Sequence, residues 1–184
     1  MTVVIGLLRG VNVGGHNKIS MEDLRAICVS LRHRTPTTYI QSGSVVFGTA
    51  ETDMAKLANR LESAIEKRLG FRPTVMLRTV ADMREVVARN PFAGRAGFEP
   101  AKLYVFFLPD APSAEVLTKL ATINVGPEKI RPLGREIHIY FPDGMGQSKL
   151  PPVLDRTLKM PATARNWNTV NKLLEIAEGH GDSE

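Results

Sequence analysis

The sequence predicts an α+β protein built from two ferredoxin-like (α-β plait) subdomains, and two observations predict it. Residues 1–79 carry apolar, β-branched runs and amphipathic runs in the order strand, helix, strand, strand, helix, strand, which is the split βαβ arrangement of a plait. Residues 80–178 carry a second series of helix and strand patterns that ends in a closing helix, and residues 179–184 form a polar tail. The halves share no sequence repeat, so the boundary follows the order of elements alone.

Apolar periodicity predicts the first strand and helix. Thr2–Arg9 is rich in Val, Ile and Leu and is typical of a buried strand. Ser20 and Asp23 resemble a helix cap, and the residues after them have the i, i+3, i+4, i+7 spacing of a helix facing a core: Leu24, Ile27, Cys28 and Leu31. Cys28 lies on this apolar stripe, so we expect a small buried thiol and not a nucleophile.

The rest of the first half predicts a hairpin, a helix and a strand. Thr37–Gln41 and Ser44–Gly48 flank the turn signal Ser42-Gly43, and Thr52–Leu69 has helical periodicity, with Thr74–Thr79 as the next strand. In the usual spatial order of a plait, the third strand lies between the first and the second. The exit of the first strand and the hairpin are therefore predicted to share one edge of the sheet.

The second half begins with a helical pattern over Val80–Arg89 and a loop over Asn90–Ala101 that contains Phe92 and Phe98. The remaining predicted elements are a strand (Lys102–Leu108), a helix (Ser113–Thr122), a hairpin turning at Gly134 (Glu128–Leu133 and Glu136–Phe141), a short helix (Val153–Leu158) and a final helix that opens over Thr163–Val170, with Thr163 or Asn166 as N-cap, and runs to about Ala177.

Composition favours a soluble globular protein in a reducing cytoplasm. The chain has 184 residues, 43% of them hydrophobic, and the apolar start lacks the layout of a signal peptide. No uncharged apolar run approaches the length of a membrane span, and a single Cys28 excludes an internal disulfide. The net charge of +5 and a pI near 9.6 would favour phosphate-bearing partners if the basic residues cluster.

The stretch Arg9–Ser20 is the strongest candidate for a binding loop. Three glycines, two asparagines and two basic side chains lie between a predicted strand and a predicted helix, which suits contact with an anion. His16-Asn17 stands where a Walker A loop needs Lys and Ser/Thr, and the glycine spacing does not fit a dinucleotide fingerprint. A generic anion site and a turn that merely reverses the chain are both compatible with the pattern.

A second polar constellation lies near the C-terminus. Arg165, Asn166 and Asn168 open the final predicted helix, where a helix N-terminus and an arginine suit a phosphate. Trp167 aligns with the apolar stripe and is predicted to be a core anchor, not a base-stacking platform. Lys149, in the glycine-rich stretch before Pro151-Pro152, would join them if the chain folds back.

The sequence contains few features typical of an active site, and it identifies neither a catalytic residue nor a cofactor. The histidines have no metal-ligand spacing, so metal dependence is not expected. His138 lies between Ile137 and Ile139 in a predicted strand. This position suits a histidine that is exposed or has its hydrogen bonds satisfied within the fold. His16, within the glycine loop, is the one histidine to test as an acid or base.

With these residues in place, the chain resembles the bacterial proteins grouped as domain of unknown function 1697. The motifs that carry the resemblance are Leu8-Arg9-Gly10-Val11-Asn12-Val13-Gly14-Gly15 with Asn17-Lys18, Tyr39-Ile40-Gln41-Ser42-Gly43, Asn90-Pro91-Phe92, Ser148-Lys149-Leu150 and Thr163-Ala164-Arg165-Asn166-Trp167-Asn168-Thr169. The resemblance implies two plait-like subdomains and supplies no activity. Ser44 stands where the family pattern usually has Asn.

The leading functional hypothesis is a protein that binds a small anionic ligand, phosphate-bearing or nucleotide-like, in a cleft between the two halves, and a transferase or hydrolase is compatible with such a site. The predicted ligand-binding residues are Arg9, Asn12, Gly14, Gly15, Lys18, Gln41, Ser42, Lys149, Arg165, Asn166 and Asn168. A nucleic-acid-binding module is the alternative, although aromatic content is only 6%. A non-catalytic protein-interaction domain is a third possibility.

Overall fold

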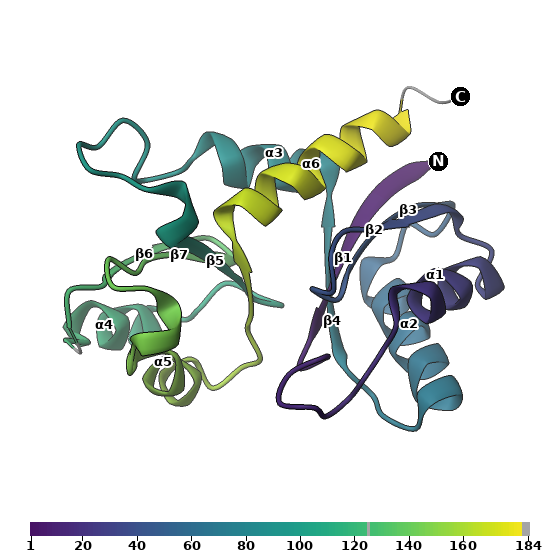
Figure 1. Cartoon of the computed structure of the whole chain (residues 1–184), viewed down its shortest axis with the longest axis horizontal. Helices are drawn as coiled ribbons and strands as arrows, with labels where there is room; N and C mark the ends of the chain where they lie inside the picture. The colour runs from purple at the N-terminus through teal and green to yellow at the C-terminus, as the bar shows by residue number, and fades with distance from the viewer. Residues whose placement is uncertain (125, 182–184) are drawn as a thin grey trace. The chain divides into compact units, whose positions relative to one another are not determined.

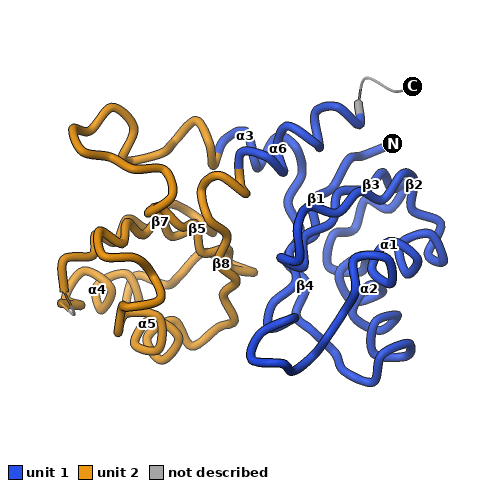
Figure 2. Tube along the Cα trace, viewed as in Figure 1, with its two compact units in different colours: residues 1–85, 171–184 blue, residues 86–170 orange. Residues whose placement is uncertain are grey.

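The structure of the protein is a computed structural model that describes residues 1–124 and 126–181 (Figure 1). The chain forms two compact units (Figure 2): one comprises residues 1–85 and the segment from Asn171 onwards, and the other comprises residues 86–170. The chain passes between the units within α3 (Val80–Ala88) and α6 (Trp167–Gly181). Each unit is described on its own below.

The first unit contains one four-stranded antiparallel sheet with the strand order β2-β3-β1-β4. Its elements are β1 (Thr2–Arg9), α1 (Met21–Ser30), β2 (Arg34–Thr38), β3 (Ser44–Thr49), α2 (Met54–Leu69) and β4 (Thr74–Thr79). The third strand lies between the first and the second, as predicted. This order places the end of β1 beside the β2–β3 connection.

Helices α1 and α2 pack on one face of this sheet (Figure 1). The buried cluster joins Leu24, Ile27 and Cys28 of α1 with Leu57, Leu61 and Ile65 of α2 and with alternate strand residues, Val4, Leu8, Val45, Phe47, Val75 and Leu77. The helices begin where the sequence supplies caps: the Ser20 hydroxyl accepts from the Asp23 N–H, and the Asp53 carboxylate accepts from the Lys56 N–H. Gly70 ends α2 in a left-handed conformation.

The second unit repeats the same topology with the sheet order β6-β7-β5-β8. Its elements are η1 (Pro100–Lys102), β5 (Leu103–Phe107), α4 (Ala114–Thr122), β6 (Lys129–Leu133), β7 (Glu136–Tyr140), η2 (Met145–Gln147), α5 (Leu150–Leu158) and β8 (Thr163–Asn166). Helices α4 and α5 bury their apolar faces on one side of the sheet through Leu120, Leu150 and Leu154. The predicted pair of plaits is therefore confirmed.

Strand β8 is the main correction to the predicted elements, because the sequence analysis placed Thr163–Asn166 inside the final helix. These four residues pair with β5, from Phe107 opposite Thr163 to Tyr104 opposite Asn166. The helix begins only at Trp167, and the Asn166 side-chain oxygen accepts from the Asn168 N–H at 3.0 Å. Thr163 as N-cap was therefore wrong, since Thr163 begins a strand.

Smaller differences concern connections and boundaries. The β2–β3 connection spans residues 39–43 and is longer than the predicted two-residue turn, and α5 begins at Leu150, so that Pro151-Pro152 occupies its first turn. The units divide near residues 85 and 170, whereas the sequence placed a boundary at 79. Of the predicted tail 179–184, residues 179–181 continue α6 and residues 182–184 lie outside the described residues.

Within the part of the chain that is described, no helix combines the length and apolar character that a membrane crossing requires.

Candidate functional site

The glycine loop, residues 10–19, connects β1 to the cap of α1 and has an unusual backbone. Five of its residues have positive φ angles: Gly10 (71°), Asn12 (56°), Gly14 (59°), Gly15 (78°) and Asn17 (50°). The tip is a miniature hairpin in which Val13 pairs with His16, and the His16 N–H donates to the Val13 carbonyl at 3.1 Å. Glycine and asparagine are the residues that adopt such angles most readily. The loop composition is therefore explained by its shape.

Two asparagine side chains hold this shape. Asn12 Nδ2 donates to the Ile19 carbonyl and Asn12 Oδ1 accepts from the Ile19 N–H, both at 3.0 Å. Asn17 Nδ2 donates to the Gly10 carbonyl at 3.2 Å. Asn12 was predicted to contact the ligand, and in the structure both polar atoms of its amide group bridge the base of the loop.

The glycine loop and the β2–β3 connection share one end of the first sheet, as the strand order predicted. The Leu8 N–H donates to the Gly43 carbonyl at 2.9 Å. Gly43 has φ +70°, and a Cβ atom there would lie 2.4 Å from Val11 Cγ2. Only glycine fits this position, which brings Gln41 and Ser42 to the same end of the sheet as Arg9.

The polar groups at this sheet end differ in how far they are engaged. The Ser42 hydroxyl hydrogen-bonds the Tyr39 carbonyl at 3.0 Å and the Ser44 hydroxyl at 2.9 Å, so it stabilises the turn. Lys18 and Gln41 are exposed, and within the described residues neither side chain has a hydrogen-bond or ion-pair partner. Arg9 is exposed at the last position of β1. A cation and an amide are thus available to a ligand here.

The remaining predicted site residues belong to the second unit. Arg165 lies on β8 and is buried, and its guanidinium donates to the Thr163 hydroxyl at 2.8 Å and the Ala164 carbonyl at 2.9 Å. Burial lowers its pKa to about 10, so the group stays protonated at neutral pH. Asn166 donates to the Ala101 carbonyl at 2.8 Å, while Asn168 and Lys149 are exposed. The structure therefore places Arg165 inside the fold and the other three at or near the surface.

Three other titratable side chains, Cys28, His33 and His138, are buried. Cys28 is fully buried, which raises its thiol pKa to about 12, as expected of a core residue. His33 is buried and stacks on Phe47 with ring centroids 4.5 Å apart. His138 is 1% exposed, and neither ring nitrogen reaches a hydrogen-bond partner in the described residues. Burial lowers the His138 pKa to about 4, opposed in part by the nearby backbone of Val86.

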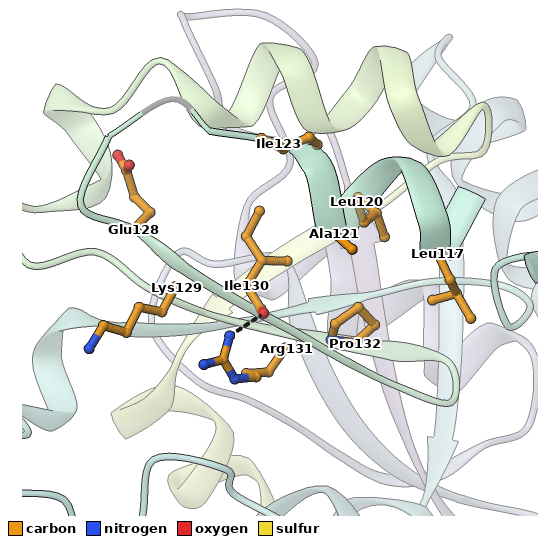
Figure 3. Close-up of a pocket in the computed structure, with 9 residues that line it drawn as sticks. All are labelled: Leu117, Leu120, Ala121, Ile123, Glu128, Lys129, Ile130, Arg131 and Pro132. Carbon is orange, nitrogen blue, oxygen red and sulfur yellow. Dashed lines mark hydrogen bonds between the residues drawn. The ribbon is translucent and has the colours of Figure 1, made fainter. Parts of the chain in front are cut away.

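A cavity of about 540 Å³ lies between α4 and the edge strand β6 (Figure 3). Leu117 and Leu120 of α4 face Ile130 and Pro132 of β6 across it. The outer edge of β6 resists addition of another strand, because Pro132 has no backbone N–H and the Arg131 guanidinium donates to the Ile130 carbonyl at 2.8 Å. The lining combines apolar side chains with the charged residues Glu128, Lys129 and Arg131, of which Arg131 is engaged by the Ile130 carbonyl.

Sequence reasoning missed Arg32 and Arg34, which line a second cavity of about 460 Å³ in the first unit. The available signal was the triplet Arg32-His33-Arg34 directly after the first predicted helix.

The described residues offer no candidate metal site, because they contain no group of three or more His, Cys, Asp or Glu side chains placed to hold an ion.

Two four-stranded antiparallel sheets, each carrying helices on one face, define an α+β protein of two α-β plait subdomains. The chain belongs to the family described as "Protein of unknown function (DUF1697)", whose sequence model matches residues 1–138. This confirms the resemblance seen in the motifs, although those at 148–150 and 163–169 lie beyond the matched residues.

A solved structure with the same fold is that of the conserved bacterial protein SP0830 from Streptococcus pneumoniae. The TM-score is 0.75 at 22% sequence identity, covering 97% of this chain and 99% of that chain. At this level of identity the similarity shows the fold alone. No functionally curated protein matches the chain.

Proposed function

We propose that the protein binds a small anionic ligand, phosphate-bearing or nucleotide-like, at the glycine loop of the first unit. One observation carries the proposal. In the first unit the first strand and helix are connected by residues 10–19, whereas the equivalent connection of the second unit, between β5 and the Ser113 cap of α4, needs only residues 108–112. The second unit forms the same plait without a ten-residue loop. The extra length and the backbone conformation of the glycine loop in the first unit therefore serve something other than folding.

The loop has the features that favour anion binding. The backbone N–H groups of Gly14 and Gly15 donate to no described protein group, and the neighbouring Lys18 ammonium has no acidic partner. Arg9 adds a second cation, and Gln41 a neutral donor, at the same end of the sheet. Because the Asn12 and Asn17 hydrogen bonds fix the loop in advance, a ligand would meet it without the entropy loss of ordering a flexible segment.

The proposal is tested by titrating ¹⁵N-labelled protein with inorganic pyrophosphate and with ADP. We expect saturable shifts of the Gly14 and Gly15 amides, and an increase in Kd of about tenfold for Lys18→Ala, since a hydrogen bond between charged groups is lost. Lys67→Ala is the matched control for loss of a positive charge, because Lys67 is an exposed lysine in the last turn of α2 and is not part of the glycine loop. Absence of saturable shifts at these glycines in the millimolar range would disprove the proposal.

Nucleic-acid binding is a second candidate, favoured by one cluster in the second unit. Tyr140 of β7 contacts the rings of Phe92 and Phe98, with centroids 5.7 and 5.8 Å apart, and Arg95 lies 5.3 Å from the centre of the Phe92 ring. Lys129 lines a small hollow of about 60 Å³ beside these rings. Phe92 is buried, so the accessible part of the cluster consists of Phe98, Tyr140, Arg95 and Lys129. Accessible aromatic and cationic side chains together are typical of single-strand binding surfaces.

Fluorescence anisotropy with a single-stranded oligoribonucleotide distinguishes this candidate. Binding through phosphates should weaken steeply as salt rises, and Lys129→Ala should reduce the slope of log K against log salt by about 0.7, the value for one phosphate contact on a single strand. A salt-independent or undetectable signal would leave the small-ligand proposal alone.

A further inference from the structure

The Arg32–Arg34 cavity, of about 460 Å³, lies at the end of the first sheet opposite the glycine loop. It is formed by the start of β1, the end of β3 and the turn between α1 and β2, and its polar lining consists of Thr2, Arg32, Arg34, Thr49 and Thr52. Thr2 pairs with Thr49 at this end of the sheet, whereas Leu7 pairs with Ser44 at the other. The cavity is therefore separate from the glycine loop.

The segment that presents the two arginines, made of the turn after α1 and the start of β2, has a strained backbone. Arg32 has φ +63° and Thr35 has φ +43°. A positive φ is rare for any residue with a Cβ and is an outlier for a β-branched residue such as threonine. Strain of this kind persists where the surrounding structure enforces it, and it gathers at binding sites.

The surroundings hold this turn from two sides. The His33 N–H donates to the Cys28 carbonyl at 3.0 Å, and the His33 ring stacks on Phe47. On the other side, His180 Nε2 lies 2.8 Å from the Thr35 carbonyl oxygen. His33 points into the fold, so the flanking side chains of Arg32 and Arg34 are left exposed at the cavity.

No acidic side chain of the described residues neutralises the positive charge of the cavity. Within the described residues, neither Arg32 nor Arg34 has an acidic partner. Glu51 and Asp53 flank the lining residue Thr52, and both carboxylates are already engaged. Glu51 pairs with Lys56 at 3.0 Å and accepts from the Thr52 and Asp53 N–H groups at 3.2 Å each, while Asp53 accepts from the Lys56 N–H at 3.0 Å. The bonds to Glu51 lower its pKa and hold this carboxylate ionised on other partners.

We propose that this cavity is a second binding site, for a phosphorylated small molecule whose phosphate is held by Arg32 and Arg34. Two guanidinium groups on one turn match the geometry of a phosphate, which takes bidentate hydrogen bonds from arginine. The Thr2 and Thr52 hydroxyls add neutral donors. A volume of about 460 Å³ exceeds the needs of a phosphate alone and falls within the range typical of small-molecule sites, so the ligand carries an organic part.

The test is an NMR titration of the whole chain with ribose 5-phosphate, read at the amides of Arg34, Thr49 and Thr52. We expect saturable shifts there, a Kd raised at least about tenfold by Arg34→Ala, and partial recovery with Arg34→Lys, which keeps the charge but loses the planar fork. Unphosphorylated ribose should produce no shifts at these positions.

Two control variants separate this site from the glycine loop. Lys18→Ala and Lys67→Ala should leave the Kd for ribose 5-phosphate, read at Thr49 and Thr52, unchanged. Lys18→Ala should weaken the binding of pyrophosphate and ADP that is read at Gly14 and Gly15. The proposal is overturned if no saturable shifts occur at Thr49 and Thr52, or if Arg34→Ala retains the wild-type Kd with an otherwise intact spectrum. Either result leaves the glycine-loop proposal standing on its own titration.

Discussion

Arg78 and Arg165 occupy the same position in the two units. Arg78 of β4 lies opposite Ile5 of β1, and Arg165 of β8 lies opposite Val105 of β5. Each is the penultimate residue of its strand, directly before the residue that leads into a helix, and each is buried. Both guanidinium groups donate to the carbonyl of the preceding residue, at 2.8 and 2.9 Å. The repeat in topology therefore extends to a pair of side chains.

This repeat makes each unit a reference for the other. Where both units have the same feature, such as the serine caps Ser20 and Ser113, the plait itself accounts for it. Where one unit departs, the plait does not require the departure. The glycine loop is such a departure in the first unit, and the long β7–α5 connection, residues 141–149, is another in the second.

Gly43→Ala should destabilise the protein more than a comparable change in the glycine loop. An alanine there adopts an unfavourable left-handed conformation and places its Cβ 2.4 Å from Val11 Cγ2, so we expect a loss of about 3 kcal/mol in the free energy of unfolding. Gly15→Ala is the control, because Gly15 has φ +78° but open space around it, and should lose about 1 kcal/mol. Urea unfolding measures both, and equal losses would contradict the packing argument.

The sequence predicted the first plait and the shared sheet end because both depend on patterns that residues reveal locally. Strand alternation, helix caps and turn glycines are set by neighbours in the chain. β8 was missed because Thr163-Ala-Arg-Asn has no apolar alternation and is a strand only through its pairing with β5. The burial of Arg165 was missed for the same reason, since a charged residue in a polar motif is ordinarily exposed.

Asn12 illustrates the corresponding limit for the candidate site. Its residue type suggested a ligand contact, yet its partner is the Ile19 backbone seven residues away, reached only because the loop turns back on itself. Lys18 and Gln41 keep their predicted availability. A sequence motif thus points to a loop more readily than it points to the individual side chains that would contact a ligand.

Asn12→Ala should therefore loosen the glycine loop without removing a ligand contact. The loss of two hydrogen bonds to Ile19 is expected to lower the free energy of unfolding by about 1 to 2 kcal/mol and to speed hydrogen exchange of the Ile19 amide. Asn17→Ala, which removes one exposed bond to Gly10, should have the smaller effect on both. Unchanged exchange at Ile19 would show that the loop does not depend on Asn12.

Cys28 should be unreactive in the folded protein. Burial raises its pKa to about 12, so at pH 8 almost no thiolate is present and the sulfur is inaccessible. Because the folded pKa lies above the unfolded value, the unfolded state loses its proton first as pH rises, and stability falls above about pH 8.5. Labelling with a thiol-reactive disulfide reagent should follow the rate of unfolding. Rapid stoichiometric labelling of the native protein would contradict the expected lack of reactivity of Cys28.

We expect His138 to limit stability in acid, because its surroundings disfavour a charged ring. Its ring lies 6.1 Å from the Trp167 ring, and Arg131 stands opposite it on β6, with Arg89 close enough to disfavour a second positive charge. The equivalent position in the first unit, opposite Ile5 as His138 is opposite Val105, holds Val46. A valine therefore satisfies this place in the plait.

The folded pKa of His138, about 4, lies below its ordinary value of 6.5, so the unfolded state binds more protons between these values. Stability should be fully present above pH 6.5 and fall by about 3 kcal/mol as the pH approaches 4. His138→Val should remove this part of the pH dependence, whereas His16→Ala, at an exposed histidine, should leave it intact. Urea unfolding at pH 7.5 and pH 5 measures the difference: if wild type and His138→Val lose the same stability between the two pH values, another group governs the acid sensitivity.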